Sequence, residues 1–194
     1  MVDLVLASAS PRRLELIARL GLCPEVVPCD VDESWHPVER AQDYVARVAL
    51  DKAVAGSAAR PGAVVLAADT AVVLDGEPLG KPIDDDDARR MLRRLAGRSH
   101  TVITAVAVCA PGGGPGPECR SASARVRFAP FGEADVEWYV GTGEPTGKAG
   151  AYALQGAGAV LVERVEGDPT TVIGLPLRLA AEMLRRAGID VPGR

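Results

Sequence analysis

The chain has 194 residues, of which 47% are hydrophobic and 25% charged, an ordinary composition for one well-packed globular domain. Its formal net charge is −4 and only 4% of its residues are aromatic, so it lacks both the cationic surface and the stacking platform of general nucleic-acid binders. The longest uninterrupted apolar stretches, such as residues 63–68, are far too short to cross a bilayer.

Strand and helix patterns alternate along the chain. Apolar or alternating segments predict strands over 2–7, 24–29, 64–68 with an extension through 72–74, 101–109, 121–128 and 160–165. Helical spacing predicts five helices. The first starts at Ser10-Pro11, the second runs over 37–60, the third follows the acidic residues 84–87, and the last two cover 133–140 and include 177–184. Asp75-Gly76 predicts a turn, and PGGGPGP at 111–117 predicts a surface loop that joins a hairpin. With no internal repeat, we expect a single α/β domain over 1–194 with a mixed sheet.

The N-terminus and the cysteines indicate the compartment. An acid precedes the first apolar run and arginines follow it, which is the reverse of a secretory signal, so we expect a cytoplasmic protein. The four cysteines form no C-x-x-C pair and the two histidines lie far apart in the sequence, which argues against a zinc site. We therefore expect the cysteines to be reduced and structural.

The first candidate site is the segment SASPRR, which includes Ser8, Ser10, Arg12 and Arg13. The start of a helix leaves backbone amides without partners and attracts anions, yet it disfavours arginines. A bound phosphate would resolve this conflict, and a salt bridge to Glu15 or another local acid would explain the arginines equally well. The segment lacks the glycines and lysine of a P-loop, and no G-x-G-x-x-G occurs in the chain.

The second candidate is Asp69-Thr70, directly after the apolar run VVLAA. A carboxylate at the carboxyl end of a buried strand points to the edge of an α/β sheet where ligands usually bind. An Asx turn that closes the strand is the alternative. Glu33, in the loop sequence DVDES, could join Asp69 in holding Mg²⁺, although the sequence gives no distance between them. The acidic run at 84–87 is better explained by helix capping than by a metal site.

Three further polar residues stand out. Lys81 is fixed between a glycine and a proline, which suits a point charge aimed at phosphate, although a solvated turn lysine is the simpler explanation. Lys52 lies inside the long predicted helix, and periodicity leaves open whether it faces a cleft or water. Gln155 follows GAYAL and precedes a glycine, so its amide could approach the edge of a base, or it could be incidental to a glycine-rich turn.

Taken together, these segments resemble the Maf family of nucleoside triphosphate pyrophosphatases. The matching motifs are S-x-S-P-R-R, A-D-T, G-K-P, K-A-G-A-Y-x-L-Q-G and V-I-G-L-P-L, and the resemblance runs from Leu4 to about Leu184. It implies an elongated mixed α/β fold with flanking helices like that of the inosine triphosphatases, with two lobes around a cleft. The segment 111–117 is the main departure, and it lies outside the motifs.

The resemblance also implies residue roles. Asp69 matches the catalytic proton acceptor, whereas Glu33, Lys52 and Lys81 match polar residues of the active cleft. Arg12, Thr70 and Gln155 match the positions associated with base selection in the branch that acts on dTTP and UTP.

The predicted reaction is therefore hydrolysis of dTTP and UTP to the nucleoside monophosphate and pyrophosphate, assisted by Mg²⁺ or Mn²⁺. Arg13, Lys52 and Lys81 would cradle the phosphates beside Ser8 and Ser10, while Asp69 and Glu33 would hold the metal. Clearance of modified pyrimidine triphosphates and a non-catalytic role in cell division are the alternatives. Besides its nucleotide substrate, we expect no nucleic-acid or membrane partner, and a homodimer is compatible with an enzyme of this size.

Overall fold

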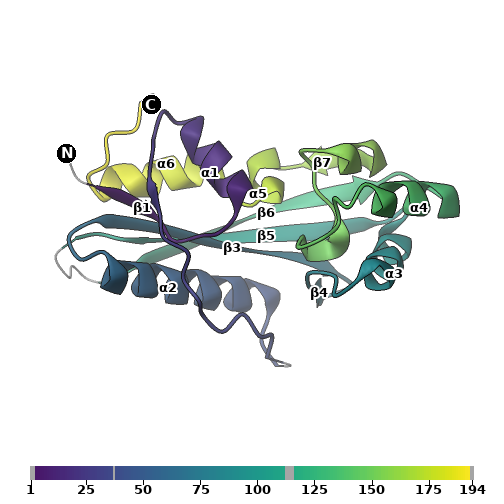
Figure 1. Ribbon diagram of the computed structural model, residues 1–194, viewed down its shortest axis with the longest axis horizontal. Helices are drawn as coiled ribbons and strands as arrows, with labels where there is room; N and C mark the ends of the chain where they lie inside the picture. The colour runs from purple at the N-terminus through teal and green to yellow at the C-terminus, as the bar shows by residue number, and fades with distance from the viewer. Residues whose placement is uncertain (1–2, 37, 112–115, 193–194) are drawn as a thin grey trace. The chain divides into compact units, whose positions relative to one another are not determined.

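The computed structural model describes residues 3–36, 38–111 and 116–192. Helices and strands alternate along the chain as the sequence predicts (Figure 1). The elements are β1 (Leu4–Leu6), α1 (Pro11–Ala18), β2 (Glu25–Val26), α2 (Ala41–Ala59), β3 (Val64–Leu74), β4 (Glu77–Leu79), α3 (Asp85–Leu95), β5 (Ser99–Cys109), β6 (Glu118–Phe128), α4 (Glu133–Gly141), the 3₁₀ turns η1 (Ala149–Ala151) and η2 (Ala157–Leu161), β7 (Val162–Glu166), α5 (Pro169–Ile173) and α6 (Leu177–Arg186).

The strands form one seven-stranded mixed sheet with the order β2-β1-β3-β5-β6-β7, and β4 pairs with β3. β1 is parallel to both β2 and β3, with Leu4 opposite Val64, whereas β3–β4 and β6–β7 are antiparallel. The predicted α/β class with a mixed sheet is therefore confirmed. Among the described residues, no helix has the length and apolarity needed to span a membrane.

The chain divides into two compact units. The first contains the described residues within Met1–Asp69, Thr104–Ala122 and Gly174–Arg194, and the second contains those within Thr70–Ile103 and Ser123–Ile173. Strands β3, β5 and β6 each contribute residues to both units. The single domain predicted over residues 1–194 stays a prediction.

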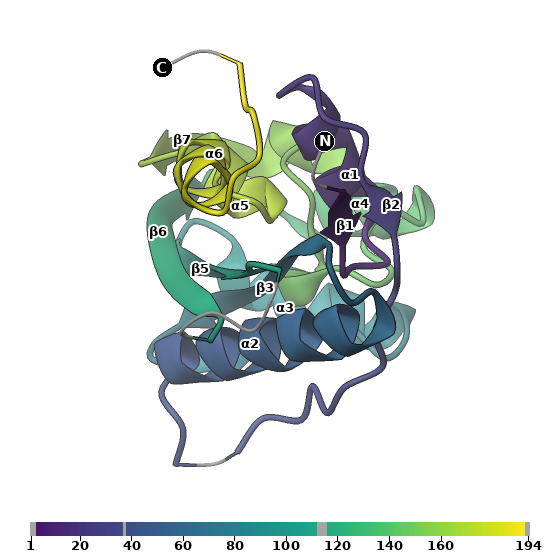
Figure 2. The ribbon, with the colours of Figure 1, turned by 90° about the vertical axis from the view of Figure 1, so that its left-hand side faces the viewer.

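In the first unit, α2 lies on one side of β3 and α6 lies on the other (Figure 2). Its core consists of aliphatic side chains from these helices and from the central strands, including the fully buried Leu6, Val48, Leu66 and Leu184. Gly56 allows α2 to approach the sheet closely, because a Cβ atom at this position would lie 2.8 Å from Cγ1 of Val65.

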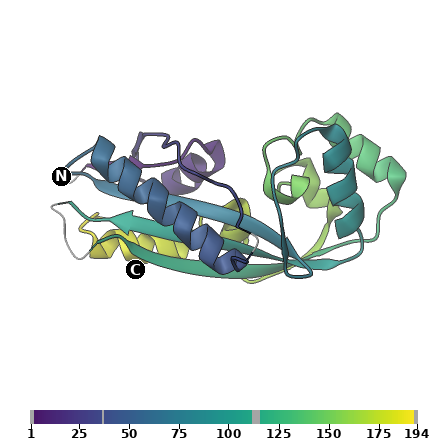
Figure 3. The same ribbon diagram turned by 90° about the horizontal axis from the view of Figure 1, so that it is seen from below.

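The second unit has its own core under α3 and α4, which pack against each other (Figure 3). The predicted apolar face of α3 is buried, and Asp84 caps this helix by accepting a hydrogen bond from the Asp87 amide at 2.7 Å, as predicted for the acidic run. Asp75 and Gly76 have φ angles of 55° and 84°, which gives the predicted turn between β3 and β4.

Several local predictions need correction. The predicted strand over 24–29 is reduced to Glu25–Val26, while β4 and the short helix α5 were not predicted at all. Ser10 stands at the N-cap of α1 as predicted, but its hydroxyl makes no capping hydrogen bond. Strand β3 does not end at Asp69-Thr70, since it continues without a break to Leu74. Most of the predicted loop at 111–117 lies outside the described residues.

Candidate active site

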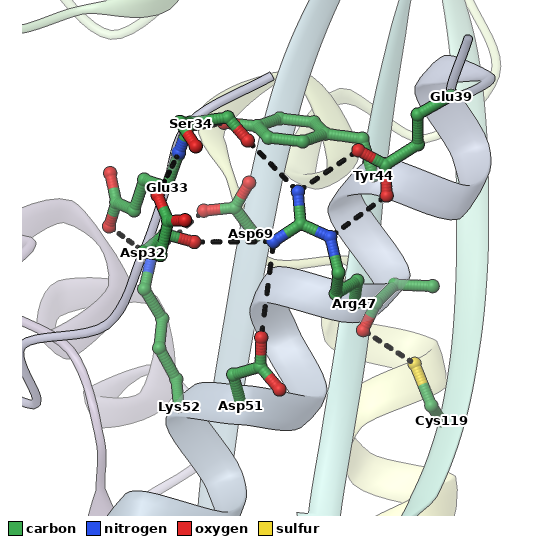
Figure 4. Close-up of polar contacts among 11 residues, drawn as sticks. Asp32, Glu33, Ser34, Glu39, Tyr44, Arg47, Asp51, Lys52, Asp69 and Cys119 are labelled. Atoms are coloured by element: carbon green, nitrogen blue, oxygen red, sulfur yellow. Dashed lines mark hydrogen bonds and ion pairs between the residues drawn. The ribbon is translucent and has the colours of Figure 1, made fainter. Parts of the chain in front are cut away.

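A buried cluster of opposite charges joins α2 to β3. The Nζ atom of Lys52 lies 2.9 Å from Oδ1 of Asp69 and 2.6 Å from Oε1 of Glu33 (Figure 4). Lys52 and Asp69 are only 6% and 7% exposed, whereas the Glu33 side chain is 38% exposed. Because isolated charges are costly to bury, the lysine and the two carboxylates stabilise one another in this place. The structure thus decides that Lys52 faces the protein interior rather than water.

Asp69 reaches this position from the middle of a strand. Its neighbours along β3, including Ala68, Ala71 and Val72, are buried, so the carboxylate stands inside an apolar run. Both sequence-based interpretations, a strand end and an Asx turn, are therefore wrong. The signal available in the sequence was the charge itself, because an acid within a buried strand requires a counter-charge from elsewhere in the chain.

The start of α1 brings a second cation, Arg13, close to this cluster. Arg13 donates from Nε to the Gly174 carbonyl at 2.9 Å and from Nη1 to Oγ of Ser8 at 3.1 Å. The buried Ser8 hydroxyl also accepts the Ser10 amide at 3.2 Å, which fixes the turn before the helix. Burial lowers the pKa of Arg13, and the nearby carboxylates of Asp69 and Glu33 act in the opposite direction. Arg13 therefore lies within the electrostatic reach of the cluster, and Ser8 holds its guanidinium.

The remaining predicted residues are differently placed. Ser10 and Arg12 are partly exposed at the start of α1, in the first unit. The second unit contains the partly buried Thr70 and the exposed Lys81 and Gln155. Their participation in one site with the first unit is a prediction from the family resemblance.

Within the second unit, two of the predicted motifs meet. The Gly150 amide donates to the Gly80 carbonyl at 3.0 Å, so the G-K-P segment lies beside the K-A-G-A-Y segment. Gly150 has a φ angle of 68°, and a Cβ atom there would lie 2.9 Å from Cγ1 of Val72. Only glycine combines this backbone conformation with such a close approach. The backbone directly before Lys81 is therefore held by a contact between two loops.

The loop that contains Gln155 is held by two residues that sequence analysis missed. The Glu144 carboxylate accepts the amides of Ala157 and Gly158, each at 2.9 Å, and the Tyr139 hydroxyl at 2.7 Å. The Tyr139 hydroxyl in turn accepts the Ala153 amide at 3.1 Å. These bonds lower the pKa of Glu144, although burial opposes them with the largest single effect. No local sequence pattern marks these residues, because their partners lie 13 or 14 positions away.

The two carboxylates that contact Lys52 suit an oxygen-binding divalent cation such as Mg²⁺. The described residues contain no group of three or more His, Cys, Asp or Glu side chains that could hold an ion. Asp69 and Glu33, however, present two carboxylates to the same ammonium group. Mg²⁺ is commonly bound by one or two carboxylates together with substrate phosphates rather than by a protein cage. The pair therefore fits a cation shared with a polyphosphate.

These features define an α/β protein whose buried charges suit a phosphorylated ligand, and comparison with known proteins gives its family. A family model described as Maf-like protein matches residues 3–187. The chain is 56% identical over 190 residues to a dTTP/UTP pyrophosphatase of Anaeromyxobacter dehalogenans strain 2CP-1, covering 97% of this chain and 96% of that protein. It is 48% identical to one from Myxococcus xanthus, covering 98% and 95% of the two chains. The chain belongs to the Maf-like protein family.

Solved structures support the fold independently. The structure of a HAM1 protein from Coxiella burnetii matches with a TM-score of 0.60 at 18% identity, covering 96% of this chain and all of that one. A nucleoside-triphosphatase / dITP/XTP pyrophosphatase from Mycobacterium abscessus matches with a TM-score of 0.50, also at 18% identity, covering 99% of this chain and all of that one. At this identity the likeness concerns the fold alone, and it confirms the mixed α/β fold that the motifs implied.

Proposed function

We propose that this protein hydrolyses dTTP and UTP to the nucleoside monophosphate and pyrophosphate. The observation that carries the proposal is the cluster of the buried Lys52 and Asp69 with the more exposed Glu33, at the positions matching the family's active cleft. The names of relatives that align over nearly their whole length support the substrate class. In the reaction, water adds to phosphorus, the anhydride bond between the α and β phosphates breaks, and pyrophosphate leaves with the electron pair of that bond.

The residues of the first unit have complementary tasks in this reaction. The guanidinium of Arg13 and the ammonium of Lys52 bind phosphate oxygens, and the Ser8 hydroxyl orients the guanidinium. Asp69 accepts the proton of the attacking water, and its ion pair with Lys52 holds the carboxylate in place. A Mg²⁺ or Mn²⁺ ion held by Asp69 and Glu33 would neutralise phosphate charge when bound.

The second unit supplies substrate selection in this proposal. Thr70 and Gln155 hydrogen-bond the O2, N3–H and O4 edge of the pyrimidine, Arg12 of the first unit contributes to base selection, and Lys81 adds a cation for the phosphates. Gln155 suits this task because its amide both donates and accepts. The predictions of a homodimer, a cytoplasmic location and no nucleic-acid or membrane partner are independent of this assignment.

The test is replacement of the proposed base. Asp69→Asn should lower pyrophosphate release at least about 100-fold, since a positioned base contributes this much or more. Nucleotide binding should remain measurable, because Arg13 and Lys52 are unchanged. Asp43→Asn, which changes an exposed acid of α2, is the matched control and should keep full activity. Retained turnover in Asp69→Asn would remove Asp69 from its role.

A nucleotide panel separates this function from its alternatives. Phosphate and pyrophosphate would be detected separately for dTTP, UTP, CTP, GTP and a modified uridine triphosphate. We expect pyrophosphate from dTTP and UTP, with GTP much slower. Faster turnover of the modified nucleotide would indicate a clearance role, and no turnover of any nucleotide would favour a non-catalytic regulator.

A further inference from the structure

The loop that carries Glu33 is fastened to α2 through its backbone. Three successive carbonyl groups accept hydrogen bonds from two side chains of the helix (Figure 4). The Tyr44 hydroxyl donates to the Glu33 carbonyl at 2.9 Å. Arg47 donates from Nη1 to the Asp32 carbonyl at 3.3 Å and from Nη2 to the Ser34 carbonyl at 3.0 Å. The backbone on both sides of Glu33 is thus attached to the helix that contains Lys52.

Arg47 is itself held in one orientation. Its Nε and Nη2 atoms each lie 2.9 Å from an oxygen of Glu39, which forms a two-point ion pair with the planar guanidinium. The Arg47 guanidinium also lies over the Tyr44 ring, 5.6 Å from its centroid. A guanidinium fixed on two sides binds the loop carbonyls with little further loss of side-chain freedom. Burial, with the charges of Asp69 and Glu33, raises the pKa of Tyr44 to about 12, so its hydroxyl keeps its proton at neutral pH.

Helix α2 both supplies Lys52 to the charged cluster and attaches the loop of Glu33, and the spacing of its residues explains how. Tyr44 and Arg47 are three residues apart, and Lys52 follows Tyr44 by eight, so Tyr44 lies within about 80° of each of the other two around the helix axis. Residues 31–36 have no regular secondary structure of their own, and the Glu33 side chain is 38% exposed. The partly exposed ion pair of Glu33 constrains the loop only weakly, so the hydrogen bonds from Tyr44 and Arg47 to the loop backbone supply most of the order of the loop.

We propose that Tyr44 and Arg47 are positioning residues that hold the backbone at residues 32–34, so that the Glu33 carboxylate stays against the Lys52 ammonium group. The proposal rests on the function proposed above for the same cluster. Replacing a residue that hydrogen-bonds to a metal ligand and orients it commonly lowers activity 10- to 100-fold. Tyr44 and Arg47 act in this way, because their contacts reach the loop carbonyls rather than the charged cluster.

The first experiment measures whether Tyr44 works through Glu33. Tyr44→Phe removes one hydroxyl and keeps the ring, which also packs 5.3 Å from the Trp35 ring. We expect kcat for dTTP to fall about 3- to 10-fold, the usual range for one lost hydrogen bond, with a smaller change in KM. In a Glu33→Gln background the same substitution should change kcat less than about 2-fold. A purely structural effect would instead multiply the two losses, and that outcome would overturn the proposal.

The second experiment tests the arginine with a conservative change and a matched control. Arg47→Lys keeps the charge but cannot make the forked contacts, so we expect kcat to fall about 10-fold or more. Arg40→Gln removes another arginine–carboxylate pair at the start of the same helix, the exposed pair between the N-cap Arg40 and Asp43, and should leave kcat unchanged. Full activity in Arg47→Lys would contradict the assigned role.

A third measurement does not depend on catalysis. Hydrogen exchange of the Ser34 amide, which donates to Oδ1 of Asp32 at 2.8 Å within the attached loop, should be about 10-fold faster without nucleotide in Arg47→Lys than in the wild type or in Arg40→Gln. Unchanged exchange overturns the positioning role whatever the activity. If the wild type releases no pyrophosphate but exchange accelerates as expected, the proposed function fails while the loop attachment stands. If the wild type is active and the Tyr44 and Glu33 losses multiply, only the positioning role fails.

Discussion

At the scale of single residues, the most unusual feature is a lysine buried between two acids. Lys52 has 8% and Asp69 has 10% of its side chain exposed, so their attraction is only weakly screened, whereas Glu33 is far more accessible. The two carboxylates face the Lys52 ammonium group, and the nearby Arg13 guanidinium adds a second positive charge.

Replacing Lys52 should show how much the protein is destabilised when Asp69 is buried without a counter-charge. Lys52→Met removes the counter-charge of Asp69, and we expect a loss of about 3 kcal/mol in the free energy of unfolding, measured with urea. Lys52→Met combined with Asp69→Leu should recover part of this loss, because an apolar pair needs no counter-charge. A neutral effect of Lys52→Met alone would show that Asp69 does not depend on this partner.

At the scale of elements, α2 determines where several site residues stand. The helix supplies Lys52 to the cluster, and Tyr44 and Arg47 to the adjacent loop. Its depth against the sheet depends on Gly56, whose missing side chain leaves room for Val65 and Ala7. The position of the lysine is thus tied to the packing of one glycine.

Two glycine-to-alanine changes should differ in their effect on the free energy of unfolding. In Gly56→Ala the new Cβ would lie 2.8 Å from Cγ1 of Val65 and 3.0 Å from Cβ of Ala7. Overpacking costs about 1–3 kcal/mol, which exceeds the gain of up to about 1 kcal/mol in helix propensity, so the protein should be destabilised. Gly141, at the end of α4, has no neighbour within 4 Å of such a Cβ, so Gly141→Ala should be neutral or stabilising. Thermal melts of both variants test this, and a stabilised Gly56→Ala would contradict the close approach.

At the scale of the whole molecule, each unit has its own core, and the second core contains a polar pair. His100 is 3% exposed, and its Nε2 atom lies 2.8 Å from the Tyr152 hydroxyl. Its other ring nitrogen, Nδ1, is buried and has no hydrogen-bond partner among the described residues. The Phe128 ring packs edge-on against both side chains. Burial lowers the pKa of His100 to about 4, so the ring is neutral in the folded protein at neutral pH.

This histidine should make the stability of the protein depend on pH. Its pKa is about 4 when folded and 6.5 as the reference value, so the unfolded chain binds the proton more readily. The stabilisation is complete above pH 6.5 and is lost as the pH falls through 4, by about 3 kcal/mol in all. His100→Gln should remove this part of the slope, measured as the difference from the wild type in urea midpoints between pH 7 and pH 4. Parallel curves for the two proteins would contradict the shifted pKa.

The elements of the fold could largely be predicted from local patterns. The apolar periodicity of α3, its cap at Asp84 and the turn at Asp75-Gly76 depend on residues within a few positions of one another. Such interactions are set by backbone geometry, so the sequence shows them directly. The very short strands β2 and β4 were missed or misjudged because two or three residues give no periodicity.

The sequence by itself determined the alternation of strands and helices, and its spaced motifs indicated the family and the candidate residues. Only the tertiary structure decided that Asp69 stands within a continuous strand, that Lys52 turns inward to meet it from 17 positions away, and that Tyr44 secures the loop of Glu33. The physical reason is that helix periods and caps follow from neighbouring residues, whereas the pairing of a buried charge depends on which distant segment the fold brings beside it.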